Sequence, residues 1–258
     1  MFIPLHDQNA LNNIRLQYVT LVIIALNIII WVITATPQLS DASAANAIYY
    51  SFGFVPAVIN DTAVLPPELI SLPEPVSYVS YAFLHGDFMH LAGNMLFIWV
   101  FGDNVEDAMG HFRFLVFYIL CAATGAYAHQ LFLPTSEAPL IGASGAAAGI
   151  VGAYLMLHPR VKVWILAFAR IPLRLSAMWV LGAWIAFQIF QLVTAVNDEV
   201  SWAAHIGGVI AGIVLIPFFK RRDVPLFDQG METEEVEPAQ IQSEKTEEAE
   251  NPQRWGRQ

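Results

Sequence analysis

The chain contains 258 residues, of which 56% are hydrophobic and only 13% are charged, and its formal net charge is −10. So few charges at this length exclude an ordinary soluble domain and favour a membrane protein. The net charge is unevenly placed, because residues 223–258 hold eight Glu, two Asp and three basic residues and alone contribute −7. Since this segment has no apolar periodicity, we expect it to be a disordered, solvated tail.

Six long stretches that contain no charged residue, or only one, follow one another along the chain. Most have about the 20 residues that a helix needs to cross roughly 30 Å of hydrocarbon, whereas the second approaches this length only when it is extended across Asp87. The stretches are Leu16–Ser40, Leu84–Gly102, Phe114–Ser136, Ala138–Pro159, Leu175–Asn197 and Val200–Phe219. We therefore predict an all-α membrane protein with six transmembrane helices.

The basic residues distinguish the two sides of the membrane. All twelve Lys and Arg fall on one side of a six-span topology. The opposite segments contain none: Pro37–Leu84, Leu133–Pro139 and Asn197–Ser201. Because Lys and Arg mark cytoplasmic loops, both termini are predicted to be cytoplasmic, and a long loop between the first two helices is predicted to lie outside. The predicted organisation is a short cytoplasmic N-terminus (1–15), a six-helix domain (16–222) and the acidic cytoplasmic tail (223–258).

Four polar residues stand out within the predicted helices. The second helix carries His90 and Asn94, whose spacing of four places them on one face. The fourth carries Ser144 and the sixth carries His205, each about five residues inside the outer end of its charge-free stretch. At 1.5 Å per helical residue, both lie roughly 8–10 Å below the outer surface. The sequence thus predicts four polar side chains at one depth.

Polar groups are costly in lipid, so these four residues are functional candidates. A serine and a histidine are also the smallest set for acyl transfer, because an imidazole can take the proton of the attacking hydroxyl. For His90 and Asn94 the alternative is hydrogen bonding between helices, which membrane bundles use. The serine and histidine at the same depth favour a catalytic role.

Small residues accompany both catalytic candidates. Gly145 and Gly149 are four residues apart in the fourth helix, and Gly208 and Gly212 lie on the same face as His205 in the sixth. Small residues at these spacings let helix backbones approach closely. Packing explains the glycines, but it does not explain the serine or the histidine.

These residues together carry a family resemblance. The motifs are His85-Gly-Asp-Phe-Met-His90-Leu-Ala-Gly-Asn94, Gly142-Ala143-Ser144-Gly145, and Ala204-His205-Ile206-Gly207-Gly208 followed by Gly212. In order, spacing and topology, about residues 1–220 resemble the rhomboid family of intramembrane serine proteases, which implies a six-helix rhomboid bundle. One departure is visible, since Val76-Ser77 stands where many members carry Trp-Arg in the first outer loop.

The resemblance implies roles for individual residues. Ser144 is expected to attack the scissile carbonyl and His205 to accept and return its proton. The side chains of His90 and Asn94, with the backbone N–H of Ser144, are the expected oxyanion hole. Supporting roles are expected for Gly142, Gly145, Gly208 and His85. No acid lies in the apolar part of the last three predicted helices, so we expect a dyad, with Asp87, Asp198 and Glu199 in loops or at the interface.

The expected partners are transmembrane protein substrates and the lipid bilayer, with no nucleic acid, no metal and no cofactor. Substrate is expected to arrive sideways past the aromatic fifth helix, which carries Trp179, Trp184, Phe187 and Phe190. The outer loop around Tyr49–Phe54 is apolar enough to rest in the membrane interface. The short N-terminus without an Arg- and Ser-rich transit segment favours a prokaryotic plasma membrane.

The same residues bear on other classes of membrane protein. A noncatalytic binder that captures transmembrane segments for quality control is the serious alternative, and the intact Ser144 and His205 favour the enzyme over it. A zinc protease needs a His-Glu-x-x-His motif, which is absent. A transporter would show inverted repeats or broken helices, and no such symmetry is visible. Cys121 is the one cysteine and is expected to be a packing residue.

Overall fold

The computed structural model describes residues 2–36, 41–167, 170–194 and 200–227. Its helices are α1 (Tyr18–Thr34), α2 (Ala42–Phe52), α3 (Pro56–Ile59), α4 (Glu74–Ser80), α5 (Phe88–Met109), α6 (His111–Phe132), α7 (Ser144–Leu157), α8 (Ala177–Thr194) and α9 (Trp202–Phe219), with short 3-10 helices at Pro67–Leu69 and Tyr81–Phe83. Its strands are β1 (Phe2–Asp7), β2 (Lys162–Ala167) and β3 (Ile171–Ser176). Asp198, Glu199 and the tail after residue 227 lie outside the described residues.

Six helices, α1 and α5 to α9, overlap the six stretches that the sequence predicts as spans. Within the described ranges, α6, α8 and α9 are long and apolar enough to cross a membrane, and α1 and α7 are apolar but shorter. Helix α5 is as long as α6, but its last two turns carry Asp103, Glu106 and Asp107. The chain is therefore a helical, multi-pass membrane protein.

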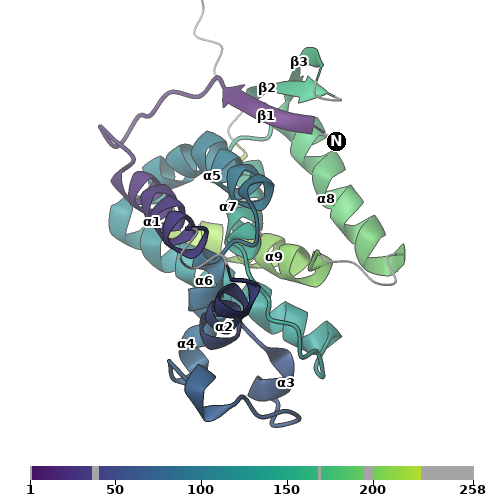
Figure 1. Cartoon of the computed structure of the whole chain (residues 1–258). Coiled ribbons are helices and arrows are strands. Elements are labelled where there is room, and N and C mark those ends of the chain that lie inside the picture. Colours follow the sequence, from purple (N-terminus) through teal and green to yellow (C-terminus); the bar gives the residue numbers. More distant parts are fainter. Residues whose placement is uncertain (1, 37–40, 168–169, 195–199, 228–258) are drawn as a thin grey trace, which may run out of the picture.

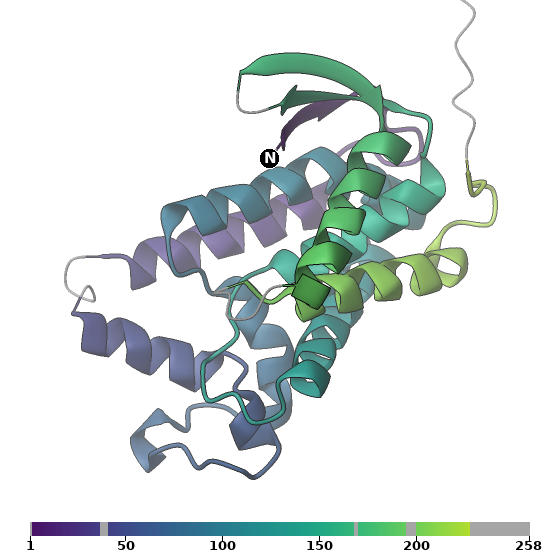
Figure 2. The same cartoon turned by 90° about the vertical axis from the view of Figure 1, so that its right-hand side faces the viewer.

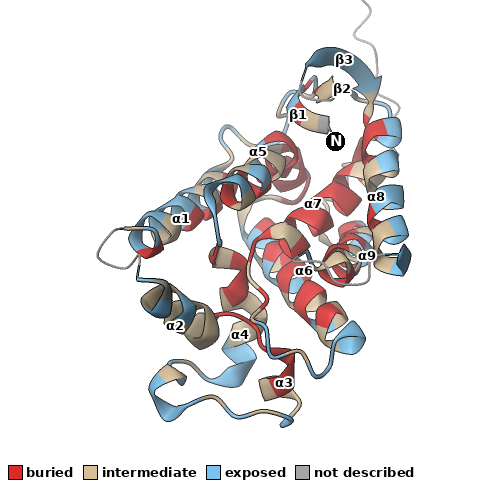
Figure 3. Cartoon of the chain, turned by 45° about the vertical axis from the view of Figure 1, so that its right-hand side comes forward, coloured by how far each residue is buried: buried red, intermediate tan, exposed pale blue. Residues whose placement is uncertain are grey.

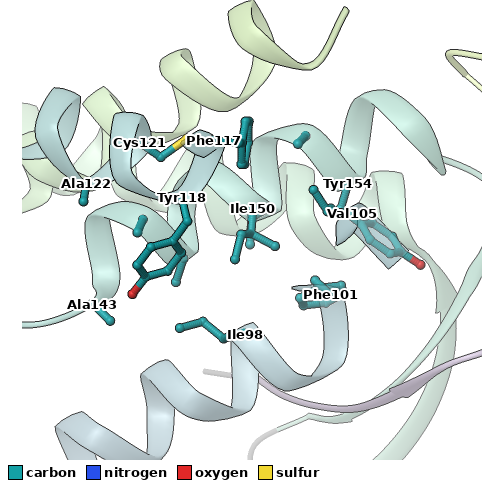
Figure 4. Packing of buried hydrophobic residues seen from close by; sticks show 14 of the residues in the cluster. Ile98, Phe101, Val105, Phe117, Tyr118, Cys121, Ala122, Ala143, Ile150 and Tyr154 are labelled. Atoms are coloured by element: carbon teal, nitrogen blue, oxygen red, sulfur yellow. The ribbon is translucent and has the colours of Figure 1, made fainter. Parts of the chain in front are cut away.

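Helix α7 lies at the centre of the bundle, where it packs against α5, α6, α8 and α9. Figures 1 and 3 show it surrounded by these helices, with nearly all of its length buried. The side chains of Ile98, Phe101, Tyr118 and Ile150 gather between α5, α6 and α7 (Figure 4). Cys121 belongs to the same core, as the sequence predicts for a packing residue.

Glycines set the separation of α7 from α9. A Cβ atom added to Gly208 would lie 2.9 Å from the carbonyl carbon of Gly145, and one added to Gly212 would lie 2.8 Å from that of Gly149. Both distances are well below the roughly 3.5–4.0 Å of a normal carbon–carbon contact. The predicted close approach of the fourth and sixth helices is therefore confirmed, because the backbones touch where side chains are missing.

A three-stranded antiparallel sheet, in the order β1-β2-β3, lies at one end of the bundle, and α2 to α4 lie at the other (Figures 1 and 2). The all-α prediction is thus wrong for residues 2–7 and 162–176. Strand β2 alternates exposed Lys162 and Trp164 with buried Val163 and Ile165, which is the period of two expected of a half-buried strand. A strand of six residues is much shorter than a transmembrane span, so the long apolar stretches do not indicate it.

The outer loop is anchored in the core and does not rest only on the surface. Phe54 is fully buried and pairs with Leu140 through an isolated antiparallel bridge. Two backbone hydrogen bonds join these residues, at 3.1 and 2.8 Å. The prediction that the loop around Tyr49–Phe54 rests in the membrane interface therefore does not hold for Phe54. The bridge fixes the extended segment that leads into α7.

A buried carboxylate joins the end of α5 to the start of α1. Glu106 is fully buried and accepts hydrogen bonds from the backbone N–H groups of Val19 and Thr20, at 3.0 and 2.8 Å, and from the Thr20 hydroxyl at 2.7 Å. The first N–H groups of a helix have no partner within it, so an acidic group there satisfies donors and complements the helix dipole. This cap holds α1 against the helix that carries His90 and Asn94.

Candidate active site

Five helices surround a cavity of about 660 Å³. Its polar lining consists of Asp87, His90, Asn94, His129, Ser136, Ser144, Ser201 and His205. The four polar residues that the sequence placed at one depth therefore line one cavity. A separate cavity of about 210 Å³ lies within the outer loop, and none of the predicted site residues lines it.

Ser144 is the first residue of α7, which corrects its expected position five residues inside a helix. The chain enters as an extended segment held by Leu140, and it turns at Gly142, whose φ of 117° is a conformation that glycine adopts readily. The Gly142 N–H donates to the carbonyl of Tyr81 at 3.0 Å. The N–H of Ser144 therefore belongs to the first turn of a helix, where backbone donors lack intrahelical partners.

His205 lies in the first turn of α9, which begins after the N-cap Ser201. Its imidazole is buried and is held on several sides. Nδ1 is hydrogen-bonded to Oε1 of Gln188 at 2.7 Å. The Trp184 ring stacks on it at 6.1 Å between centroids, and the Trp202 ring meets it edge-on at 5.8 Å. The hydrogen bonds among the described residues do not include one between Ser144 and His205, which share the cavity wall.

His90 and Asn94 lie beside the turn that leads to Ser144. The His90 ring packs directly against Gly142, so that a Cβ atom at this glycine would overlap it. The same Cβ would lie 3.6 Å from Nδ2 of Asn94. Helix α5 begins here because Asp87 caps it by accepting from the His90 N–H at 2.9 Å. Side-chain donors of α5 and the first amide of α7 are therefore neighbours.

His85 is buried behind Asn94 and does not line the cavity. Its Nε2 lies 2.9 Å from Nδ2 of Asn94 and 3.4 Å from the N–H of Ala143. Because both partners are donors, Nε2 is the accepting nitrogen of the ring. His85 thus contacts both the Asn94 amide and the residue before Ser144, and its supporting role remains a prediction.

Two polar residues of the site were missed by the sequence analysis. Gln188 of α8 is 2% exposed and holds His205. His129, in the last turn of α6, is hydrogen-bonded through Nδ1 to the Ser201 hydroxyl at 2.6 Å, at the start of α9. Each is a polar side chain inside a charge-free stretch, and this is a signal that could have identified both.

The aromatic residues of the fifth predicted helix divide into two groups. Trp179 and Phe190 are more than half exposed and face away from the bundle, whereas the half-exposed Phe187 ring meets Trp202 of α9 edge-on at 5.8 Å. Trp184 instead lines the cavity and stacks on His205.

Tyr49 of the outer loop donates to the carbonyl of His85 at 3.3 Å, and its burial, with the nearby charge of Asp87, raises the pKa of this phenol.

Comparison with known proteins identifies the same region of the chain. A model of the Rhomboid domain matches residues 73–222. The chain is 31% identical over 149 residues to Rhomboid protein 1, mitochondrial, of Saccharomyces cerevisiae. The aligned region covers 54% of this chain and 40% of that protein. It is 27% identical over 138 residues to Rhomboid protease GlpG of Yersinia pseudotuberculosis and of Yersinia pestis, covering 54% of this chain and 46% of each relative.

The chain thus spans less than half the length of the curated relatives that it matches. The Rhomboid domain match includes all three motifs that carry the candidate residues, from His85 to Gly212. Because this match extends over more than half of the chain, the chain belongs to the rhomboid family.

Proposed function

We propose that this chain is an intramembrane serine endopeptidase that cleaves transmembrane segments of membrane proteins near the outer face of the membrane. The observation that supports it best is the cavity shared by Ser144, His205, His90 and Asn94 from three helices. Membership of the rhomboid family, whose matched relatives include proteins named rhomboid protease, points to the same activity.

In the proposed reaction, the Ser144 hydroxyl attacks the scissile carbonyl while Nε2 of His205 accepts its proton. A serine hydroxyl is a weak nucleophile until a neighbouring base takes this proton. His205 then gives the proton to the leaving amine, and the acyl-enzyme forms. A water molecule then attacks the acyl carbon while His205 takes its proton; the ester bond to Ser144 breaks, the carboxylic acid product leaves, and His205 returns the proton to the serine oxygen. The reaction requires the Ser144 hydroxyl and Nε2 of His205 to be within hydrogen-bonding reach when substrate is bound.

Negative charge develops on the former carbonyl oxygen during attack. The side chains of His90 and Asn94 and the N–H of Ser144 are the proposed donors to it, because they lie together beside Gly142. Preorganised donors of this kind are usually the largest single contribution to acyl transfer. The missing side chain at Gly142 leaves room for His90 there.

The proposed topology has six spans with both termini in the cytoplasm, a protease domain over residues 16–222 and a cytoplasmic acidic tail over 223–258. A prokaryotic plasma membrane is the proposed location. Substrate is proposed to enter sideways past α8, because Phe190 is exposed, the half-exposed Phe187 bridges to α9 through an edge contact with Trp202, and few residues of α8 are buried. The cavity opens among loops that contain no Lys or Arg, in agreement with an outer, non-cytoplasmic mouth.

The experiment compares purified full-length protein with Ser144→Ala in cleavage of a transmembrane test substrate and in labelling by a fluorophosphonate. We expect the variant to lose both activities while it keeps the thermal unfolding temperature of the wild type. Ser136→Ala is the matched control, since this loop serine lines the same cavity, and it should retain both activities. Undiminished cleavage by Ser144→Ala would contradict the serine mechanism. Capture of the substrate without cleavage by the wild type would favour a noncatalytic binder.

A further inference from the structure

Gln188 is a buried polar side chain in the middle of α8. It is 2% exposed, whereas the other buried residues of this helix, Ala177, Val180 and Leu181, lie near its start. A buried amide in a membrane helix is costly unless its donors and acceptors are used. The partners of Gln188 therefore identify its role.

Both ends of the Gln188 amide have partners, and these fix its orientation. Nε2 donates to the backbone carbonyl of Trp184 at 3.3 Å, one turn earlier in α8. Oε1 consequently faces His205 and lies 2.7 Å from its Nδ1. An amide oxygen can only accept, so Nδ1 of His205 must carry the proton of the neutral ring. The unprotonated nitrogen is then Nε2, the one that can accept a proton from a serine.

We propose that Gln188 is a positioning residue for the catalytic base, which holds the His205 ring in the tautomer and orientation that leave Nε2 free for Ser144. The proposal rests on the proposed protease function. The neutral amide of Gln188 would then be the third group beside Ser144 and His205. The described parts of α7, α8 and α9 contain no carboxylate that could take this place. In serine proteases with a triad, a buried acid fixes the tautomer of the histidine in this way.

Helix α8 contacts the imidazole through two residues one turn apart. Gln188 fixes Nδ1, and Trp184 stacks on the ring face. Trp202 meets the ring from α9 itself. Since α8 buries few residues against the rest of the bundle, the orientation of the base depends on where α8 lies.

The test uses two substitutions of Gln188 and a control on the same helix. Gln188→Leu removes the accepting oxygen with little change in size, whereas Gln188→Glu retains an acceptor. Gln191→Leu makes the same chemical change one turn further along at a half-buried residue that does not bond His205. The rate of fluorophosphonate labelling is the main measurement, because it reports Ser144 activation without entry of a transmembrane segment. Cleavage of the test substrate gives kcat and KM separately.

We expect Gln188→Leu to lower the labelling rate and kcat about tenfold, since one hydrogen bond is lost and a buried donor is left unpaired, with KM nearly unchanged. Gln188→Glu should recover most of the labelling rate, and Gln191→Leu should match the wild type. In ¹⁵N NMR, with the His205 signal assigned from its absence in His205→Ala, the wild type should show a protonated Nδ1, and Gln188→Leu should lose this preference.

If Gln188→Leu keeps the labelling rate and the kcat of the wild type, the inference is overturned while the protease function stands. Equal losses in Gln188→Leu and Gln191→Leu would also overturn it, because they would reflect a general disturbance of α8. If the wild type cleaves nothing and resists labelling, the proposed function fails by itself. An Nδ1 without a proton in the wild type contradicts the inference independently of any activity.

Discussion

Replacing Gly212 by Ala tests whether backbone contact between α7 and α9 sets the geometry of the active site. The new Cβ would lie 2.8 Å from the carbonyl carbon of Gly149 and 3.0 Å from its Cα. A normal contact of about 3.5–4.0 Å then requires the helices to separate by roughly 1 Å. Overpacking of this kind costs about 1–3 kcal/mol of stability. A displacement of about 1 Å between reacting groups can also lower the rate about 100-fold.

The control is Gly182→Ala in α8, because a Cβ atom at Gly182 would have no neighbour within 4 Å. Its helix should be stabilised slightly, by roughly 0.5–1 kcal/mol, since alanine loses less backbone entropy than glycine. Denaturant titration in detergent gives the stability of each variant, and fluorophosphonate labelling gives the reactivity of Ser144. If Gly212→Ala is as stable and as reactive as Gly182→Ala, the close contact does not set the separation of the two helices.

Two further predictions concern the proposed oxyanion donors and the sheet of β1, β2 and β3. Asn94→Ala should lower kcat for the transmembrane test substrate by about 10²–10³, and an unchanged kcat would remove Asn94 from the proposed site. Burial raises the pKa of Asp7 from 3.8 to about 6, although Tyr154 donates to its carboxylate at 2.6 Å. Because folding favours the protonated form, the free energy of unfolding should fall as pH rises from about 4 to 6, by up to about 3 kcal/mol. Asp7→Asn should flatten this dependence in unfolding titrations at several pH values, and an equal slope in both proteins would contradict it.

Sequence patterns predicted the parts of this molecule that depend on local composition. Charge-free stretches located the helices, and glycine spacing located the contact of Gly208 and Gly212 with α7. The motifs around Ser144 and His205, and the depth expected for both residues, predicted that these side chains lie together. Both line one cavity. Their catalytic roles remain predictions.

The parts that sequence analysis missed depend on contacts between distant segments. Strand β1 pairs with a hairpin about 160 residues later, and no local pattern specifies such a partner. The start of α7 at Ser144 follows from the turn at Gly142 and from the Phe54–Leu140 bridge, whereas an apolar stretch gives no helix boundary. Gln188 was visible as a polar residue in a span, but its bond to His205 joins two helices and needs the tertiary structure.

The pairing of β1 has a consequence for how the chain is assembled during synthesis. Phe2 pairs with Ala167, and Asp7 pairs with Val163, so β1 leaves the ribosome long before its partner strand exists. At about 5–20 residues per second, this delay is roughly 10–30 s. The first four hydrophobic segments can enter the bilayer within that interval. The sheet therefore forms late and fastens the N-terminal segment to a bundle whose early helices are already inserted.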